Sequence, residues 1–367
     1  MAFRISRTAE TLSIARLFIF SCMVMAAIVL LAPRPLAALG REYEVRELTP
    51  HTFVWVPDDI VDQNGDPRFP RASNVGFVIT SEGVVVIGTT NNPFHAREVL
   101  YEIRQRTEIP VRLVIDLGAQ GDQMLGNEVF AEQRATILST SAALAEMRTY
   151  ERGLARRMSI DPQFPARMRG IHFTLPNRTF QDQMSFNMGG EEVRVMSVNC
   201  GLPGASSGDA VVYLPAEKVL FLGDLYANNY VPEIDSCDVQ RWITALGNME
   251  KWNVVSFIPA HGNFGTKDDL AKFRGFLQWL NSSVEVSIRQ GKSLAEVEDS
   301  LLPSSPLNRL ARELAPRAIA SVYEQLIRKR MAHVVPRGAT NPPASPRGKN
   351  VPETGFIRSP RPQAENY

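Results

Sequence analysis

The residues of this chain best suited to chemistry lie in polar segments that directly follow apolar runs. The run 111–117 is followed by Gly-Ala-Gln-Gly-Asp-Gln, whose charged residue is Asp122. The run Leu220-Phe-Leu-Gly leads into Asp224, and Ile258-Pro-Ala leads into His261. Carboxylates and imidazoles ligate divalent metal ions and transfer protons, so metal binding and general acid–base work are the chemistry that these side chains could do.

The segment 112–130 resembles the signature of the metallo-β-lactamase superfamily. That signature is an apolar strand followed by H-x-H-x-D-H and then a Gly-Asn turn into a helix. Here the three histidine positions hold Gly118, Gln120 and Gln123, and only Asp122 is kept. The resemblance therefore predicts the fold of the superfamily, but not its usual metal chemistry.

Four further blocks extend this resemblance over most of residues 41–290, in the right order. The segment 83–89 is similar to G-V-V-V-I-D-T, with Gly88 where an aspartate that supports the metal loop is usual. The segment 204–209 is similar to G-H-T-x-G-D, with Ala205 in place of the histidine. The blocks that carry Asp224 and His261 resemble L-F-x-G-D and P-G-H-G, and both residues are intact. Together these blocks predict an α/β fold, the four-layer α/β/β/α sandwich.

The resemblance implies that a dinuclear zinc site is missing. Family members hold two Zn²⁺ ions that generate hydroxide near neutral pH. Gly118 and Ala205 offer no donor atom, and Gln120 offers only a neutral amide, which is a poor zinc ligand. The chain has only five histidines, and the four outside the motif positions are predicted to be ordinary surface or core residues: His51, His95, His172 and His333.

The retained residues Asp122, Asp224 and His261 are then expected to converge on the second metal position. Two carboxylates and an imidazole could bind a single Zn²⁺, Mn²⁺ or Fe²⁺ ion, with water completing the shell. In the alternative interpretation no metal binds. Asp122 then caps the start of a helix, and Asp224 and His261 bond to each other.

Two functions follow from these alternatives. The first is a non-hydrolytic pseudoenzyme that binds a small molecule or a protein partner in an open pocket around Gly118, Gln120, Gln123 and Ala205. The second is a mononuclear metal-dependent hydrolase of an ester, lactone, thioester or lactam. In that enzyme Asp122 would serve as a ligand and as the possible base for water, with Asp224 and His261 as ligands.

The elements that must position these residues come in two similar sets, at 74–140 and 183–288. The first set is predicted to begin with a hairpin over 74–88 and to continue with a helix over 91–107, a strand over 111–115 and a helix over 125–133. Beyond it we expect a mostly helical stretch at 138–170, strands at 171–180, 183–198, 209–214, 218–222 and 254–258, and helices at 239–252, 267–288, 294–301 and 307–331.

The N-terminal segment 1–40 has the pattern of a secretory signal peptide. Basic residues precede the apolar run 17–32, and Ala38-Leu-Gly provides small residues for cleavage. The alternative is an uncleaved membrane anchor. The chain is therefore expected to be exported, either periplasmic or secreted, or else membrane-anchored. In an exported compartment Cys200 and Cys237 could form a disulfide, and two separate buried thiols are the alternative.

Composition bounds the remaining possibilities. The 367 residues have 44% hydrophobic content and a formal net charge of +1, as is typical of a globular protein. No basic stripe with interleaved aromatic residues is present, so nucleic-acid binding is not expected. The segment 41–334 is predicted to form one domain. The Pro- and Arg-rich tail 335–367 is predicted to be disordered, because it cannot bury enough apolar area to order itself.

Overall fold

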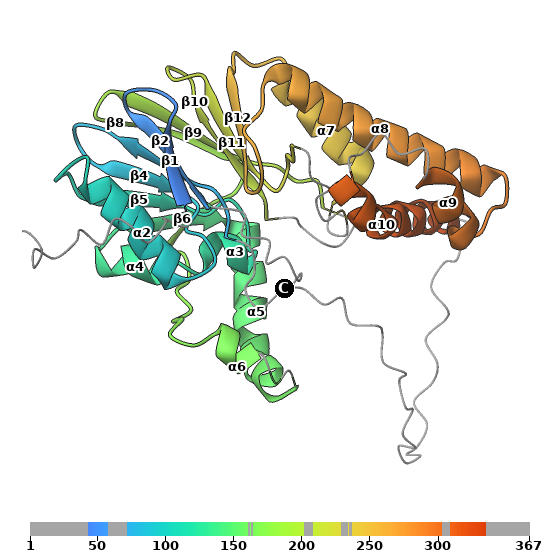
Figure 1. The fold of residues 1–367 in the computed structure, drawn as a ribbon, viewed down its shortest axis with the longest axis horizontal. Helices are drawn as coiled ribbons and strands as arrows, with labels where there is room; N and C mark the ends of the chain where they lie inside the picture. Colours follow the sequence, from blue (N-terminus) through green and yellow to red (C-terminus); the bar gives the residue numbers. More distant parts are fainter. Residues whose placement is uncertain are drawn as a thin grey trace, which may run out of the picture. The chain divides into compact units, whose positions relative to one another are not determined.

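Two β-sheets pack face to face, with a shared apolar core between them (Figure 1). This computed structural model describes residues 43–57, 72–160, 162, 164–201, 208–228, 234, 237–302 and 309–334. Among these residues, no helix combines the length and the apolar character that crossing a membrane requires. The predicted signal segment 1–40, the Ala205 position and the tail 335–367 lie outside the described residues.

The first sheet has seven strands in sequential order. They are β1 (Tyr43–Glu47), β2 (Thr52–Pro57), β3 (Val75–Ile79), β4 (Val84–Ile87), β5 (Val111–Ile115), β6 (Thr136–Thr140) and β7 (Arg178–Phe180). Strands β1 to β4 pair antiparallel, whereas β4 to β7 pair parallel. The carboxyl ends of the parallel strands therefore meet at one edge, and the segment that carries Asp122 leaves β5 there.

The second sheet has five strands in the order β12-β11-β10-β9-β8. They are β8 (Gln183–Met188), β9 (Glu191–Ser197), β10 (Ala210–Leu214), β11 (Val219–Gly223) and β12 (Ser256–Pro259). Strands β11 and β12 are parallel neighbours. Asp224 directly follows β11 and His261 lies two residues after β12, so the parallel pairing brings these two residues to the same edge of the sheet.

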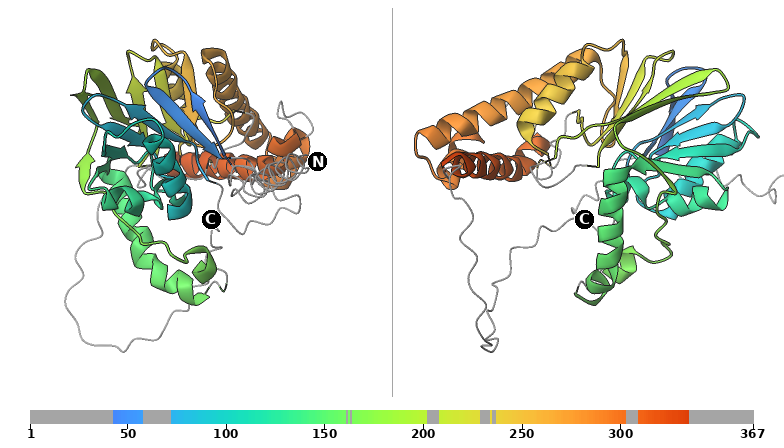
Figure 2. Two further views of the ribbon diagram at one scale, coloured as in Figure 1. Left: turned by 60° about the vertical axis from the view of Figure 1, so that its left-hand side comes forward. Right: turned by 180° about the vertical axis from the view of Figure 1, so that it is seen from behind.

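Helices cover the outer face of each sheet. On the first sheet, α2 (Pro93–Arg104) and α4 (Asn127–Glu132) contribute Val99 and Phe130 to a core that contains Phe77. On the second sheet, α7 (Val239–Met249) and α8 (Lys267–Arg289) bury Trp242 and Leu270. Two further helices, α9 (Leu294–Leu301) and α10 (Arg309–Val334), pack against α8 (Figure 2). The predicted four-layer α/β/β/α sandwich is confirmed.

The helix predicted over 125–133 is wrong in its bounds. The structure has two short helices there, α3 (Gly121–Met124) and α4, with Gly126 between them. A Cβ on Gly126 would lie 2.0 Å from the Thr89 carbonyl oxygen, so the chain passes against the backbone after β4 at this point. Such a close approach depends on a partner far away in sequence, which the helical spacing of 125–133 does not report.

Three strand predictions also need correction. Strand β6 lies within the parallel part of the first sheet and was not predicted, because its short sequence Thr-Ile-Leu-Ser-Thr leads directly into α5 (Ser141–Ile160). The strand predicted over 171–180 is present only as β7. The stretch 183–198 is a hairpin instead of one strand, with Gly189 and Gly190 at positive φ in its turn.

A disulfide joins Cys200, which follows β9, to Cys237, which precedes α7. The two Cα atoms are 5.0 Å apart, and both side chains are buried in the core beside the second sheet. Of the two alternatives left open for these cysteines, the structure has the disulfide. Asp224 lies between the two cysteines in sequence, so the cross-link closes the loop that carries it.

Candidate metal site

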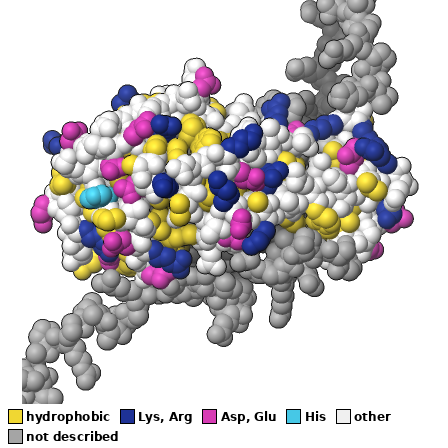
Figure 3. Space-filling model, turned by 90° about the horizontal axis from the view of Figure 1, so that it is seen from above, with side chains coloured by type: hydrophobic (Ala, Val, Ile, Leu, Met, Phe, Trp, Pro, Cys, Tyr) yellow, Lys and Arg dark blue, Asp and Glu magenta, His cyan; other side chains and the backbone are white. Residues whose placement is uncertain are grey.

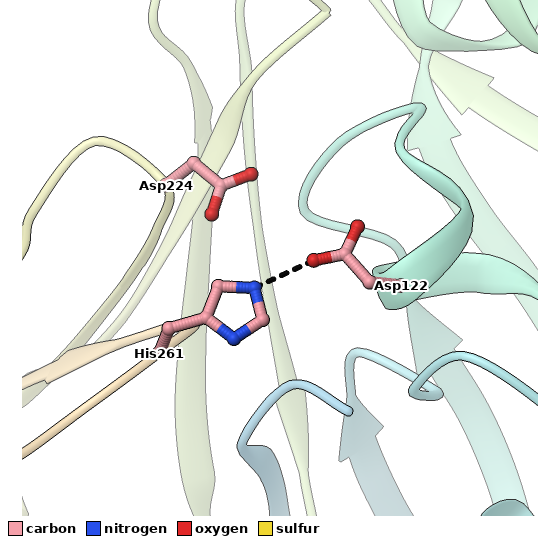
Figure 4. A group of neighbouring side chains, drawn as sticks. All are labelled: Asp122, Asp224 and His261. Carbon is pink, nitrogen blue, oxygen red and sulfur yellow. Dashed lines mark hydrogen bonds and ion pairs between the residues drawn. The ribbon is translucent and has the colours of Figure 1, made fainter. Parts of the chain in front are cut away.

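Asp122, Asp224 and His261 point toward one another at the shared edge of the two sheets (Figure 4). One ligand-type atom from each lies within 4.8 Å of the other two. Asp122 is on α3, Asp224 follows β11 and His261 follows β12. Three residues from three separate segments therefore meet as the sequence predicted, and a single divalent ion would fit their oxygen and nitrogen donors.

The side chains of Asp122 and His261 are in hydrogen-bond contact with each other. The Asp122 Oδ2 and the His261 Nε2 are 2.6 Å apart, and their side chains are only 18% and 15% exposed. Partial shielding from water strengthens such a carboxylate–imidazole contact. Asp122 is not the cap of α3, because the N-cap position is occupied by Gln120. The alternative prediction of a capping role for Asp122 is therefore wrong.

Gln123 reaches Asp224 from α3. Its Nε2 donates to the Asp224 Oδ2 at 2.6 Å, and the glutamine is 2% exposed. The Gln123 backbone carbonyl accepts from the Thr89 amide at 2.8 Å, which holds α3 against the segment after β4. Gln123 occupies the last histidine position of the resembled motif, where it provides a hydrogen-bond donor to the carboxylate and no imidazole.

The segment before β3 holds both sides of the cluster in place. The Ser73 hydroxyl donates to the Asp122 carbonyl at 2.7 Å. The Asn74 side-chain amide donates to the Pro259 carbonyl at 3.0 Å and to the Gly262 carbonyl at 3.2 Å. Asn74 thus brackets His261 from both sides in sequence, and its neighbour Ser73 anchors Asp122. No motif signalled either residue, because their partners lie far away in the chain.

Two glycines give the backbone the turns that aim the cluster. Gly223 has φ +55° and directly precedes Asp224, and Gly262 has φ +85° and directly follows His261. Residues with a Cβ are strained in this left-handed region, whereas glycine adopts it readily. Glycine is therefore favoured before Asp224 and after His261 because the backbone at both positions has positive φ.

In the other half of the resembled site, the described motif positions Gly118 and Gln120 carry neither an imidazole nor a carboxylate. Gly118 is buried, and a Cβ there would lie 2.7 Å from the Gln120 Oε1 and 3.5 Å from the Asp209 Oδ1. The space that a ligand side chain at 118 would need is therefore filled by Gln120. Ala205 lies outside the described residues. Gly118 supplies no donor and Gln120 only a neutral amide, so the described part of this position does not fit a zinc ion.

We call the positions of Gly118 and Gln120 the emptied half of the site. Two carboxyl groups, those of Glu146 and Asp209, lie beside it. Burial raises the pKa of Glu146 to about 7, with a further increase from the charge of Asp209 and an opposing hydrogen bond from the Gly208 backbone. Asp209 belongs to the G-A-S-S-G-D block, so a sequence signal for it existed. Glu146 has none, because it is one of two acidic residues within the arginine-rich helix α5.

A third carboxyl group, Asp116, lies beneath the loop at the end of β5. Complete burial raises its pKa to about 8, although a hydrogen bond from Asn127 acts in the opposite direction. The Asn127 Nδ2 donates to the Asp116 Oδ2 at 2.8 Å, while the other carboxyl oxygen is buried without a partner. Asp116 is therefore held as the neutral acid at neutral pH.

The remaining histidines lie elsewhere. His95 bonds to Asn91 and Asn92 at the start of α2, and His172 bonds to Glu128 at 2.8 Å. His51 is exposed in the loop before β2, and the side chain of His333 lies outside the described residues. None of the described three belongs to the cluster of Asp122, Asp224 and His261.

Comparisons with known proteins support the fold. No protein-family model matches the chain. A linear primary-alkylsulfatase of Pseudomonas sp. is 21% identical over 213 residues, which cover 49% of this chain and 40% of that enzyme. A metallo-β-lactamase from Pontibacter korlensis is similar with a TM-score of 0.50 and 20% identity, covering 64% of this chain and 99% of the lactamase.

Two structures of sec-alkylsulfatases are also similar. The stereoselective inverting enzyme Pisa1 from Pseudomonas sp. has a TM-score of 0.56 and 18% identity, over 77% of this chain and 50% of that one. A double mutant of PisA1 has a TM-score of 0.58 and 18% identity, over 81% and 52%. The chain thus spans about half the length of the alkylsulfatases, or less. At these identities the likeness shows that the chain has the metallo-β-lactamase fold.

Proposed function

We propose that this chain, with its metallo-β-lactamase fold, is a non-hydrolytic binding protein. The observation that carries the proposal is the bond from the Gln123 amide to Asp224 at 2.6 Å. A dinuclear enzyme needs that position to supply a lone pair, whereas here it supplies an N–H group. Together with the bond between Asp122 and His261, it satisfies polar groups of the cluster without an ion.

The emptied half supports the same conclusion. Gln120 fills the space next to Gly118, and Glu146 and Asp209 lie beside it. Amide and carboxyl groups can donate and accept hydrogen bonds, so they suit a polar small molecule or a loop of a partner protein. Under this proposal, the polar groups of Gln120, Glu146 and Asp209 recognise the ligand.

Elemental analysis of the purified full chain tests the proposal. After dialysis against Zn²⁺, Mn²⁺ and Fe²⁺, we expect no stoichiometric metal and a cooperative unfolding transition. One equivalent of metal that is lost in Asp224→Ala but retained in Asp268→Ala would contradict it. Asp268 is a suitable control because it is an exposed carboxylate on α8.

A specific observation favours a second candidate, a mononuclear metal-dependent hydrolase. The donor atoms of Asp122, Asp224 and His261 lie within 4.8 Å of one another, so these residues would hold one ion. A bound divalent ion supplies a hydroxide near neutral pH. Asp122, bonded to His261, would take the proton of the attacking water.

The substrates of this enzyme would be esters, lactones, thioesters or lactams, and the likeness to alkylsulfatases adds sulfate esters of alkyl chains. Hydrolysis of such a panel that is lost in His261→Ala and kept in His51→Ala would support this candidate over the first. His51 is an exposed histidine outside the cluster, so its removal controls for an unspecific effect.

We also propose that the chain is exported and loses its segment 1–40. Intact-mass analysis of protein from its native membrane or secreted fraction tests this directly. A chain that begins near Arg41 supports cleavage, whereas a chain that keeps the segment supports an anchored protein.

A further inference from the structure

A small cavity of about 200 Å³ opens between the two sheets, away from the candidate metal site. Arg112 and Thr136 line it at the beginning of the parallel strands β5 and β6, whereas Asp122 follows the end of β5. From the second sheet, the inner side of β8 contributes Met184, Phe186 and Met188. Figure 3 shows the face that lies opposite α3 and α5, where apolar side chains lie among Lys, Arg, Asp and Glu.

A β-bulge directs Arg112 toward this opening. The pairing of β4 with β5 jumps from Val84–Val111 to Val85–Leu113, which leaves Arg112 as the extra residue. Bulges re-aim the side chain of the inserted residue. A Cβ on Gly83 would lie 2.4 Å from the Arg112 Cγ and 3.1 Å from the Met188 Sδ. The aliphatic part of the Arg112 side chain therefore packs over Gly83, next to Met188 of the other sheet.

Arg178 brings a second guanidinium to the same cavity from β7. It pairs in register with Leu138, whose side chain belongs to the core between the sheets. Paired residues of neighbouring strands share a face of the sheet, so Arg178 also points to the inter-sheet side. Within the described part of the chain, neither the Arg112 nor the Arg178 side chain has a hydrogen bond or an ion pair, and no carboxylate lines the cavity.

We propose that this cavity binds the carboxylate of a short single-chain fatty acid. Two guanidinium groups offer forked N–H donors that match a carboxylate, and the apolar walls take the alkyl chain. Methionine side chains adapt to a flexible chain. The volume is below the roughly 300–1,000 Å³ of sites for drug-sized ligands, which selects a short chain over a bulky lipid. The inference is independent of the proposed function at the metal position.

Calorimetric titration of the full chain with octanoate at low ionic strength tests the proposal. We expect saturable binding to one site, weakened about tenfold or more by the double substitution Arg112→Gln and Arg178→Gln. The substitution Thr136→Leu fills the cavity from β6 and should abolish binding. If that variant does not fold, Met184→Ala enlarges the cavity and should shift the preference toward decanoate.

Four comparisons make the test specific. Octanol, which has the chain without the charge, and octyltrimethylammonium, which has the opposite charge, should both bind at least about tenfold more weakly than octanoate. Arg148→Gln, an exposed position on α5, should leave the affinity unchanged. Chelation of metal by EDTA should also leave it unchanged. Equal affinity for octyltrimethylammonium, unaltered binding in the double arginine variant, or loss of binding with EDTA would overturn the proposal.

Discussion

The two halves of the candidate site face each other across one loop, yet they differ in what their side chains can do. In the retained half, Asp122, Asp224 and His261 keep donor atoms within 4.8 Å. In the emptied half, Gly118 has no side chain and Gln120 fills the space in front of it. Gly118, Gln120 and Asp122 all lie in the segment that follows β5. The fold therefore brings three potential metal ligands together in one half, while the described motif positions of the other half offer only glycine and an amide.

The difference between the halves predicts unequal responses to restored histidines. Gln123→His replaces the amide that bonds to Asp224 with an imidazole inside the retained half. We expect the affinity for Zn²⁺ to rise by about 10–100-fold, the range that a change in one partner of a metal site commonly spans. Competition with a chelating dye measures this.

The matched control is Gln120→His in the emptied half. Its neighbour Gly118 offers no donor atom, so an imidazole there has little to cooperate with, and we expect no comparable gain. Equal gains in the two variants would show that the halves are chemically alike and would break the comparison.

The hydrogen bonds that Asn74 makes on either side of His261 should contribute more to stability than a hydrogen bond in an exposed hairpin. Asn74→Ala removes two donors from the Pro259 and Gly262 carbonyls, which flank His261. Loss of a partner for buried carbonyls should lower the free energy of unfolding by about 1–3 kcal/mol. Chemical denaturation measures the change, with Asn187→Ala in the exposed β8–β9 hairpin as the control. If both variants lose the same free energy of unfolding, Asn74 does not anchor the segment around His261.

Asp116 is fully buried directly after β5 and should make stability depend on pH. Burial raises its pKa to about 8 in the folded chain, above the ordinary value of 3.8 for an aspartic acid, so the folded state binds more protons between these values. Stability from this group is complete below pH 3.8 and is lost as pH rises toward about 8, with a slope of up to about 1.4 kcal/mol per pH unit.

Asp116→Asn should remove that dependence and stabilise the protein at pH 7 by up to about 4 kcal/mol, which is the slope above taken over roughly three pH units. Thermal unfolding at pH 5 and pH 7 measures it, with Glu132→Gln on the exposed side of α4 as the control. If the variant has the same pH profile as the parent, Asp116 does not carry the proton.

The smallest effect that we expect concerns the pKa of Glu146, which lies beside the emptied half. Glu146 titrates at about 7 partly because Asp209 is close. Asp209→Asn removes that negative charge, so the pKa of Glu146 should fall by less than about one unit, since burial is the larger cause. Carbon NMR of the labelled carboxyl groups follows the titration. An unchanged pKa would place the two carboxyl groups in separate environments.

Several elements could be read from the sequence because their signals are local. The hairpin 74–88 contains two apolar runs around Ser-Glu-Gly, and the helix predicted at 294–301 has the bounds found in the structure. Strand β6 could not be read in this way, because its identity as a strand comes from parallel pairing with β5 and β7. Sequence periodicity reports which face of a segment is apolar, but not which neighbours it pairs with.

The sequence by itself determined which donors this protein owns. It placed Asp122, Asp224 and His261 in ordered blocks after apolar runs, and it put Gly118, Gln120 and Gln123 where histidines would stand. Residue type is a local property, so no structure was needed to see that these three positions carry no imidazole.

Only the tertiary structure decided what these residues bond to. The contact between Gln123 and Asp224 spans 101 residues, and that between Asp122 and His261 spans 139. The burial of Glu146 and Asp116 and the re-aiming of Arg112 by a bulge also depend on how the strands pair. Side-chain partners and dielectric surroundings arise when distant segments pack together, and no local pattern in the chain encodes them.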